Sequence, residues 1–312
     1  NRGGDFVTLQ DAVDSFITYR ESYCSEITVN NYKANLNIFV KFVNDDELQV
    51  EDMSPLTIVA YQKHLRDFVN PARNKKLAVR SIRTYMTDVR TFFNYLEDFE
   101  LIEKNPVKKV KIIKDTQRQL APLTCDEVAA IDRCFNLENV IGLRNYIMFH
   151  LFLDCGLRRQ EAFKLRFCDV HFREGYIFVQ GKGRKERFVA LPLFLKDRFK
   201  IYLTMLGEPL ASPEHCFKLI DGREFTDDAL KDVYARLKRR TNIERLHPHF
   251  CRHTFATSYI FYGGDVINLR EILGHYDVEI TQNYVHEASK LRLIKYPIYK
   301  IDECFIGGFK NE

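Results

Sequence analysis

The sequence contains no hydrophobic run that approaches the roughly 20 residues a helix needs to cross a bilayer. Its first residues also lack the charged and apolar regions of a signal peptide. No internal repeat or low-complexity tract is present, and the amino-acid usage is ordinary for a soluble chain. We therefore expect a globular protein of the cytoplasm, with no membrane partner.

The sequence also lacks any cysteine framework. Eight cysteines are scattered along the chain without a CxxC pair. This spacing argues against both a disulfide scaffold and a zinc ribbon. We expect the cysteines to be reduced core residues, and we predict no structural metal.

A large excess of positive charge is missing as well, since the net charge is only +4. Affinity for a polyanion must then come from clustering. Two stretches, residues 63–90 and 104–118, are strongly basic, although a solvated helix face or a polar linker would give the same pattern. The residues that we predict to contact DNA are Arg73, Lys75, Lys76, Arg80, Arg83, Lys108, Lys109 and Lys111.

A chain of 312 residues is about twice the usual domain size, which predicts two domains. Over the first hundred residues, apolar positions recur three and four apart and indicate helices. A basic stretch without amphipathic order follows. We predict an N-terminal helical bundle at residues 1–103, an interdomain linker at 104–121 and a second domain at 122–312.

The second domain is predicted to be mainly helical with a small antiparallel sheet. A strongly apolar helix covers residues 143–154. Two short β-branched runs, 175–180 and 187–191, flank a Gly-Lys-Gly segment typical of a hairpin, which puts Lys182 in a β-turn. Helices resume near residue 226, so the fold class is mainly α (α+β).

Three short segments and one tyrosine carry the chemistry: Gly156 to Glu161, His249 to Arg252, Leu273 to His275, and Tyr284. Each is weak by itself. An Arg and a Glu three apart usually form a surface ion pair, a single histidine is usually structural, and a tyrosine in an apolar helix usually lies in the core.

Together and in this order, the segments resemble the signature of the tyrosine recombinase family, which includes phage integrases and Xer proteins. The match runs from Gly156 to Tyr284, with departures at Arg159 and Gln160. The resemblance implies the catalytic residues Arg158, Lys182, His249, Arg252, His275 and Tyr284, with Glu161 steadying the first arginine.

The same resemblance implies how the protein works, and it implies a prokaryotic protein associated with the nucleoid. The helical bundle would be a core-binding domain that forms a C-shaped clamp around double-stranded DNA with the catalytic domain. Tyr284 would form a 3′-phosphotyrosine bond without a cofactor. Recombination would pass through a Holliday junction held by a homo-tetramer, possible accessory proteins would assist, and the free protein could be a monomer. Integration or excision of a mobile element is the favoured role, with dimer resolution and inversion left open.

These residue types suit that reaction. Planar guanidinium groups match the non-bridging oxygens of a phosphate, which fits Arg158 and Arg252. A tyrosine with a pKa of about 10 needs a proton acceptor, for which His249 is the candidate. Lys182 could protonate the departing 5′ oxygen, and His275 could donate to the phosphate.

Three other hypotheses remain open. A type IB topoisomerase would use nearly the same side chains to relax supercoils. A zinc enzyme could use His247, His249 and His253, which lie close in sequence. A DNA-binding protein could also keep this fold without catalysing anything.

Overall fold

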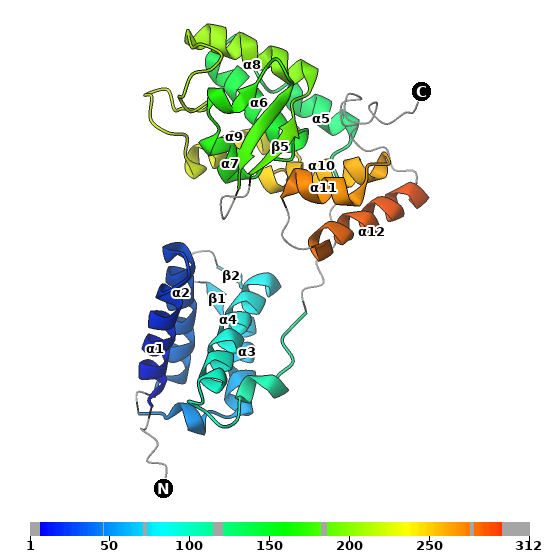
Figure 1. The fold of residues 1–312 in the computed structure, drawn as a ribbon. Helices are drawn as coiled ribbons and strands as arrows, with labels where there is room; N and C mark the ends of the chain where they lie inside the picture. The colour runs from blue at the N-terminus through cyan, green and yellow to red at the C-terminus, as the bar shows by residue number, and fades with distance from the viewer. Residues whose placement is uncertain are drawn as a thin grey trace. The chain divides into compact units, whose positions relative to one another are not determined.

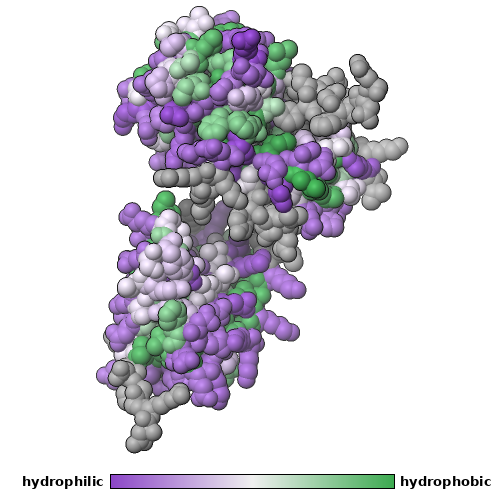
Figure 2. Space-filling model, viewed as in Figure 1, coloured by the Kyte–Doolittle hydropathy of each residue, from purple (hydrophilic) through white to green (hydrophobic). Residues whose placement is uncertain are grey.

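The computed structural model describes residues 7–45, 47–70, 74–114, 121–181, 186–274 and 278–294. The chain divides into two compact units, residues 1–118 and 119–312 (Figure 1). Each unit has a hydrophobic core of its own. Hydrophilic residues prevail on the visible surface of both units, with hydrophobic residues scattered between them (Figure 2). Within the described ranges, no helix has the length and apolar character to span a bilayer.

The first unit is a bundle of helices. Its first three α-helices each follow a Ser or Thr whose side-chain oxygen accepts a backbone N–H of the first turn. Aromatic side chains such as Phe16, Phe39 and Phe92 fill the core. Its elements are α1 (Leu9–Glu21), α2 (Glu26–Val43), the 3-10 helix η1 (Val50–Asp52), α3 (Pro55–Asp67), the strands β1 (Val69–Asn70) and β2 (Lys75–Lys76), α4 (Val79–Asp98) and the 3-10 helix η2 (Pro106–Lys109).

The first part of the predicted linker packs against this unit. Val107 and Val110 are buried in its core. Gln62 of α3 donates to the carbonyl oxygen of Lys111 at 3.3 Å and accepts from the backbone N–H of Ile113 at 3.0 Å. The linker was predicted to begin at residue 104, but residues 106–113 pack on the first unit. The apolar residues between the lysines explain this packing, because they are buried in the core of that unit.

The second unit is mainly helical and holds a three-stranded antiparallel sheet in the order β3-β4-β5. The predicted hairpin is present as β4 and β5, paired from Tyr176 with Ala190 to Gln180 with Glu186. The elements are α5 (Cys125–Asp132), α6 (Val140–Leu153), α7 (Arg159–Lys164), the 3-10 helix η3 (Phe167–Asp169), β3 (Val170–His171), β4 (Tyr176–Gln180), β5 (Glu186–Ala190), α8 (Leu193–Leu206), α9 (Asp227–Thr241), α10 (Pro248–Phe261), α11 (Val266–Leu273) and α12 (Val278–Ile294).

Helix α10 is central to the second unit. It contacts the buried helix α6 as well as α11 and α12. Figure 1 shows α10, α11 and α12 lying side by side. Arg292 of α12 donates to the carbonyl oxygens of Ile260 and Phe261 at the end of α10. Because these carbonyls have no partner within their own helix, the arginine both caps α10 and fastens α12 to it.

Candidate active site

The chain reaches Arg158 through a tight turn after α6. Gly156 has a φ of +61°, and a Cβ built on it would lie 2.7 Å from Cδ1 of Phe255. Only glycine combines that left-handed backbone with so close a neighbour. The turn sets Arg158 immediately before the first residue of α7, with its side chain 39% exposed.

Glu161 holds Arg158 from the first turn of α7. Its carboxylate accepts from the backbone N–H of Arg158 at 2.6 Å and from Nη1 of the same residue at 3.0 Å. Burial by itself would raise the pKa of Glu161, but hydrogen bonds and charge from Arg187, and then from Arg158, hold it at about 2. The carboxylate is therefore ionised at neutral pH.

Arg187, on β5, is the second partner of Glu161 and was given no role by the sequence interpretation. Its Nη1 and Nη2 each lie 2.7 Å from one carboxylate oxygen of Glu161. Such a two-pronged contact is the strongest geometry for an arginine and a carboxylate. The only sequence signal was its position at the end of the Gly-Lys-Gly-x-Lys-Glu-Arg segment.

Arg252, on α10, is almost fully buried, with 2% of its surface exposed. It donates to the carbonyl oxygen of Gly156 and, at 2.7 Å, to that of Leu273. Burial and the positive charge of Arg158 lower the pKa of its guanidinium, while Glu161 opposes them. A buried cation next to like charges is stabilised by an arriving anion, so the surroundings of Arg252 favour a negatively charged group.

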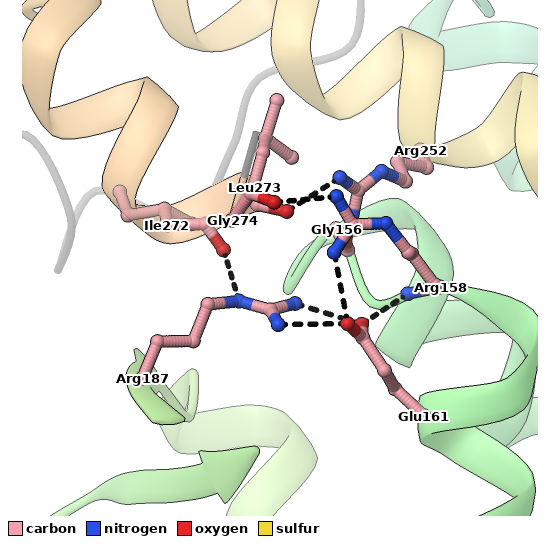
Figure 3. Close-up of polar contacts among 8 residues, drawn as sticks. All are labelled: Gly156, Arg158, Glu161, Arg187, Arg252, Ile272, Leu273 and Gly274. Carbon is pink, nitrogen blue, oxygen red and sulfur yellow. Dashed lines mark hydrogen bonds and ion pairs between the residues drawn. The ribbon is translucent and has the colours of Figure 1, made fainter. Parts of the chain in front are cut away.

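The end of α11 brings the three arginines together (Figure 3). The consecutive carbonyl oxygens of residues 272, 273 and 274 accept, in that order, from Arg187, Arg252 and Arg158, each at 2.7 Å. The last carbonyls of a helix lack internal partners and carry its negative partial charge, which offsets repulsion among the guanidinium groups. Gly274 ends the helix with a φ of +61°, and a Cβ there would lie 3.3 Å from two of the guanidinium groups.

Tyr284 lies on α12 and is 7% exposed. Burial raises the pKa of its phenol above the ordinary value. The positive charge of Arg252 opposes this, the charge of Glu287 adds to it, and Arg158 opposes it too. The positive charges of Arg158 and Arg252, the two arginines predicted to be catalytic, therefore both act to lower the pKa of this phenol. It stays protonated at neutral pH, so a nucleophilic role requires a proton acceptor.

Helix α12 is held against α10 by a buried carboxylate one turn after Tyr284. Glu287 accepts from Oγ1 of Thr257 at 3.1 Å and pairs with Nε2 of His253 at the same distance. The ring of His253 lies 5.5 Å from that of Tyr284. These contacts fix the nucleophile candidate relative to the helix that carries Arg252.

His249 is exposed in the first turn of α10 and is one of the residues lining a cavity of about 520 Å³ beside α9. His247 caps α10 by accepting from the backbone N–H of Phe250 at 3.1 Å. The histidines proposed as a zinc site do not gather into one, since no cluster of three metal-binding side chains occurs among the residues that the structure describes.

Some predicted residues lie outside the described ranges, namely Lys182, His275 and Arg73. The other residues predicted to contact DNA are exposed on the first unit: Lys75, Lys76, Arg80, Arg83, Lys108, Lys109 and Lys111. Arg80 and Arg83 share one face at the start of α4, whereas Lys108 is paired with Glu97 at 2.7 Å.

Comparison with known proteins identifies relatives along both units. Residues 122–290 match the phage integrase family, and residues 8–112 match the phage integrase SAM-like domain. The tyrosine recombinase XerC of Oceanobacillus iheyensis is 29% identical over 89% of this chain and 92% of its own length. The tyrosine recombinase XerD of Listeria innocua is 28% identical over 91% of this chain and 96% of its own.

Solved structures share the fold. The integrase of transposon Tn1549, in complex with a circular intermediate DNA, has a TM-score of 0.73 at 16% identity and covers 93% of this chain and 99% of its own. The XerH recombinase, bound to a palindromic difH substrate, has a TM-score of 0.72 at 18% identity over 95% and 97%. With the family matched across more than half of its length, the chain belongs to the phage integrase family and is a tyrosine site-specific recombinase, an enzyme that cleaves and rejoins DNA.

Proposed function

We propose that Tyr284 attacks a phosphodiester of double-stranded DNA and keeps the strand end as a 3′-phosphotyrosine. The observation that carries this proposal is the packing of α12, which holds Tyr284, against α10 and α11. Arg252 comes from α10, and the last carbonyls of α11 hold both Arg252 and Arg158. In the proposal, a phosphate bound by both guanidinium groups meets the phenol oxygen, and the positive charges of Arg252 and Arg158 act on that buried phenol.

Arg158 and Arg252 hold the scissile phosphate in this proposal. Negative charge grows on the non-bridging oxygens during attack, and fixed guanidinium donors stabilise that charge most strongly in a site shielded from water. Glu161 and the carbonyl oxygens at the end of α11 keep the donors in place before DNA arrives. Little reorganisation is then needed at the moment of reaction.

Two further residues transfer protons, and a third binds the phosphate. His249 takes the phenol proton, Lys182 gives a proton to the departing 5′ oxygen, and the imidazole of His275 donates to the phosphate. Support for these roles comes from the sequence match and from the raised pKa of Tyr284, whose burial creates the need for a base. The phosphotyrosine bond conserves the energy of the broken DNA bond, so rejoining needs neither ATP nor a cofactor.

Each site cleaves one strand, and a full exchange therefore uses four protomers on two duplexes and a Holliday junction. The exposed basic residues of the first unit, such as Lys75, Arg80 and Arg83, contact the DNA backbone. We place this reaction in a bacterial cytoplasm. We favour integration or excision of a mobile element, and Xer-type dimer resolution is the second candidate because the relatives above include XerC and XerD proteins.

A plasmid assay tests this function. Two copies of DNA taken from beside the gene are placed in direct repeat on a supercoiled plasmid. We expect the protein to resolve it into two circles and Tyr284→Phe to leave it intact. Relaxation of a plasmid without the sites would instead assign a type IB topoisomerase activity. No covalent change of any plasmid, with DNA binding intact, would assign a non-catalytic role.

A further inference from the structure

The side chain of Arg187 is nearly as buried as that of Arg252, although the proposed reaction does not use it. Its side chain is 9% exposed. It donates twice to Glu161, which also holds Arg158, and once from Nε to the carbonyl oxygen of Ile272, next to the two carbonyls that hold Arg252 and Arg158. The partners lie on α7 and α11, 26 and 85 residues away in the sequence.

Glu161 connects Arg187 to Arg158. Oε1 of this carboxylate accepts from Nη1 of Arg187 at 2.7 Å and from Nη1 of Arg158 at 3.0 Å. Oε2 accepts from Nη2 of Arg187 at 2.7 Å and from the backbone N–H of Arg158 at 2.6 Å. Arg187 therefore fixes both oxygens of the group that orients Arg158.

The end of α11 makes a second connection. Arg187 binds the carbonyl of residue 272, while Arg158 binds that of residue 274 (Figure 3). A shift of this helix end relative to β5 would displace the acceptor of Arg158. With both connections in place, Arg158 has little freedom to move away from Arg252.

We propose that Arg187 is a positioning residue for DNA cleavage, which acts by holding Arg158, through Glu161 and the end of α11, in the orientation that binds the scissile phosphate. It touches neither DNA nor Tyr284 in this role. The inference rests on the proposed function. It predicts that the effect of losing Arg187 is transmitted through Arg158 and disappears when Arg158 is absent.

The test uses single-turnover cleavage of a nicked suicide duplex at saturating protein. Arg187→Gln should slow formation of the covalent complex by about 100-fold, the loss typical of removing one donor to an oxyanion. Affinity for the duplex should change less than about threefold, because Arg187 makes no DNA contact. In an Arg158→Ala background, adding Arg187→Gln should lower the cleavage rate by less than about a further threefold. Losses that multiply in the double variant would overturn the proposal.

A modified substrate separates positioning from general support of the fold. A methylphosphonate at the scissile position removes the charged oxygen that Arg158 stabilises, so the defects of Arg158→Ala and Arg187→Gln should both shrink by about tenfold or more. An equal defect of Arg187→Gln on both substrates would mean that Arg187 only supports the fold.

Two further variants test whether the defect of Arg187→Gln comes from unfolding. Arg187→Gln leaves the buried carboxylate of Glu161 with Arg158 as its remaining charged partner. The double variant Arg187→Gln/Glu161→Gln removes that buried charge as well and should show the same substrate dependence. Arg144→Gln is the matched control, since Arg144 is also buried but donates to Lys218 and Asn145. It should cleave both substrates at the wild-type rate. Absence of any adduct from the wild-type protein would instead refute the proposed function itself.

Discussion

Arg158 donates a 2.7 Å hydrogen bond from Nη2 to the carbonyl oxygen of Gly274, a residue 116 positions further along the chain. The bond joins the start of α7 to the turn after α11, and Arg187 and Arg252 bind the two preceding carbonyls. The helix end that leads toward His275 thus gathers the guanidinium groups of the site.

Replacing Gly274 should damage the site more than the fold. Gly274→Ala places a methyl group 3.3 Å from Arg158 and Arg187 on a left-handed backbone. We expect a loss of about 1 kcal/mol in unfolding free energy from the backbone and a cleavage rate about tenfold slower from displaced donors. Gly207→Ala is the control, because Gly207 has a φ of +70° and no atom within 4 Å of its Cβ position. Equal cleavage by the two variants would contradict the prediction.

Arg158 and Arg252, the two arginines proposed to bind the scissile phosphate, should differ in how much their loss destabilises the fold. Arg158→Ala should slow cleavage by about 100-fold or more with little change in melting temperature, because its side chain is 39% exposed. Arg252→Ala should slow cleavage as much and also destabilise the fold by about 1–3 kcal/mol, since the carbonyls of Gly156 and Leu273 lose their donor. Denaturant unfolding and adduct formation measure the two effects. An Arg252→Ala protein as stable as the wild type would refute this difference.

Lys182 should act on the leaving group. Lys182→Ala should cleave ordinary DNA about 100-fold more slowly, the scale of a lost general acid. A substrate with a bridging sulfur at the 5′ position needs no proton on departure, so its cleavage should recover. Lys185→Ala, in the same segment, should show no such selectivity. If sulfur rescues neither variant, or both equally, Lys182 is not the acid.

The second unit should lose stability in alkali through His150. This buried ring donates toward Asp154 at 2.6 Å and Asp132 at 3.0 Å. Burial would lower the pKa of His150, but the two carboxylates raise it to about 9. The protonated ring therefore adds stability that is complete below the unfolded pKa of about 6.5 and is lost as pH rises through 9, on the order of 3 kcal/mol. Denaturant midpoints from pH 6 to 10 measure this, and His150→Gln should flatten the curve. If the denaturant midpoint of His150→Gln falls with pH as steeply as that of the wild type, His150 is not the cause of the loss of stability in alkali.

The sequence predicted local features well. The helices of the first hundred residues and the β4–β5 hairpin each depend on neighbouring residues, and both are present. The left-handed glycine at 274 was likewise predictable from its place at a helix end.

Long-range contacts were not predictable in this way. Arg187 resembled any basic residue of a strand, because its partners lie on elements distant in sequence. The packing of Val107 and Val110 was hidden by the lysines around them. The partners of Arg187 and the packing of Val107 and Val110 both depend on which segments meet in the folded chain. The periodicity of apolar residues within one segment does not show which other segment it will contact.

The claim that Tyr284 is the nucleophile is tested most directly by mapping the covalent bond. The protein is incubated with a nicked suicide duplex, digested with protease, and the nucleotide-bearing peptide is sequenced by mass spectrometry. We expect a single modified residue, Tyr284, joined to a 3′ phosphate, and no adduct from Tyr284→Phe. A nucleotide attached to any other residue, or an adduct that persists in Tyr284→Phe, would contradict it.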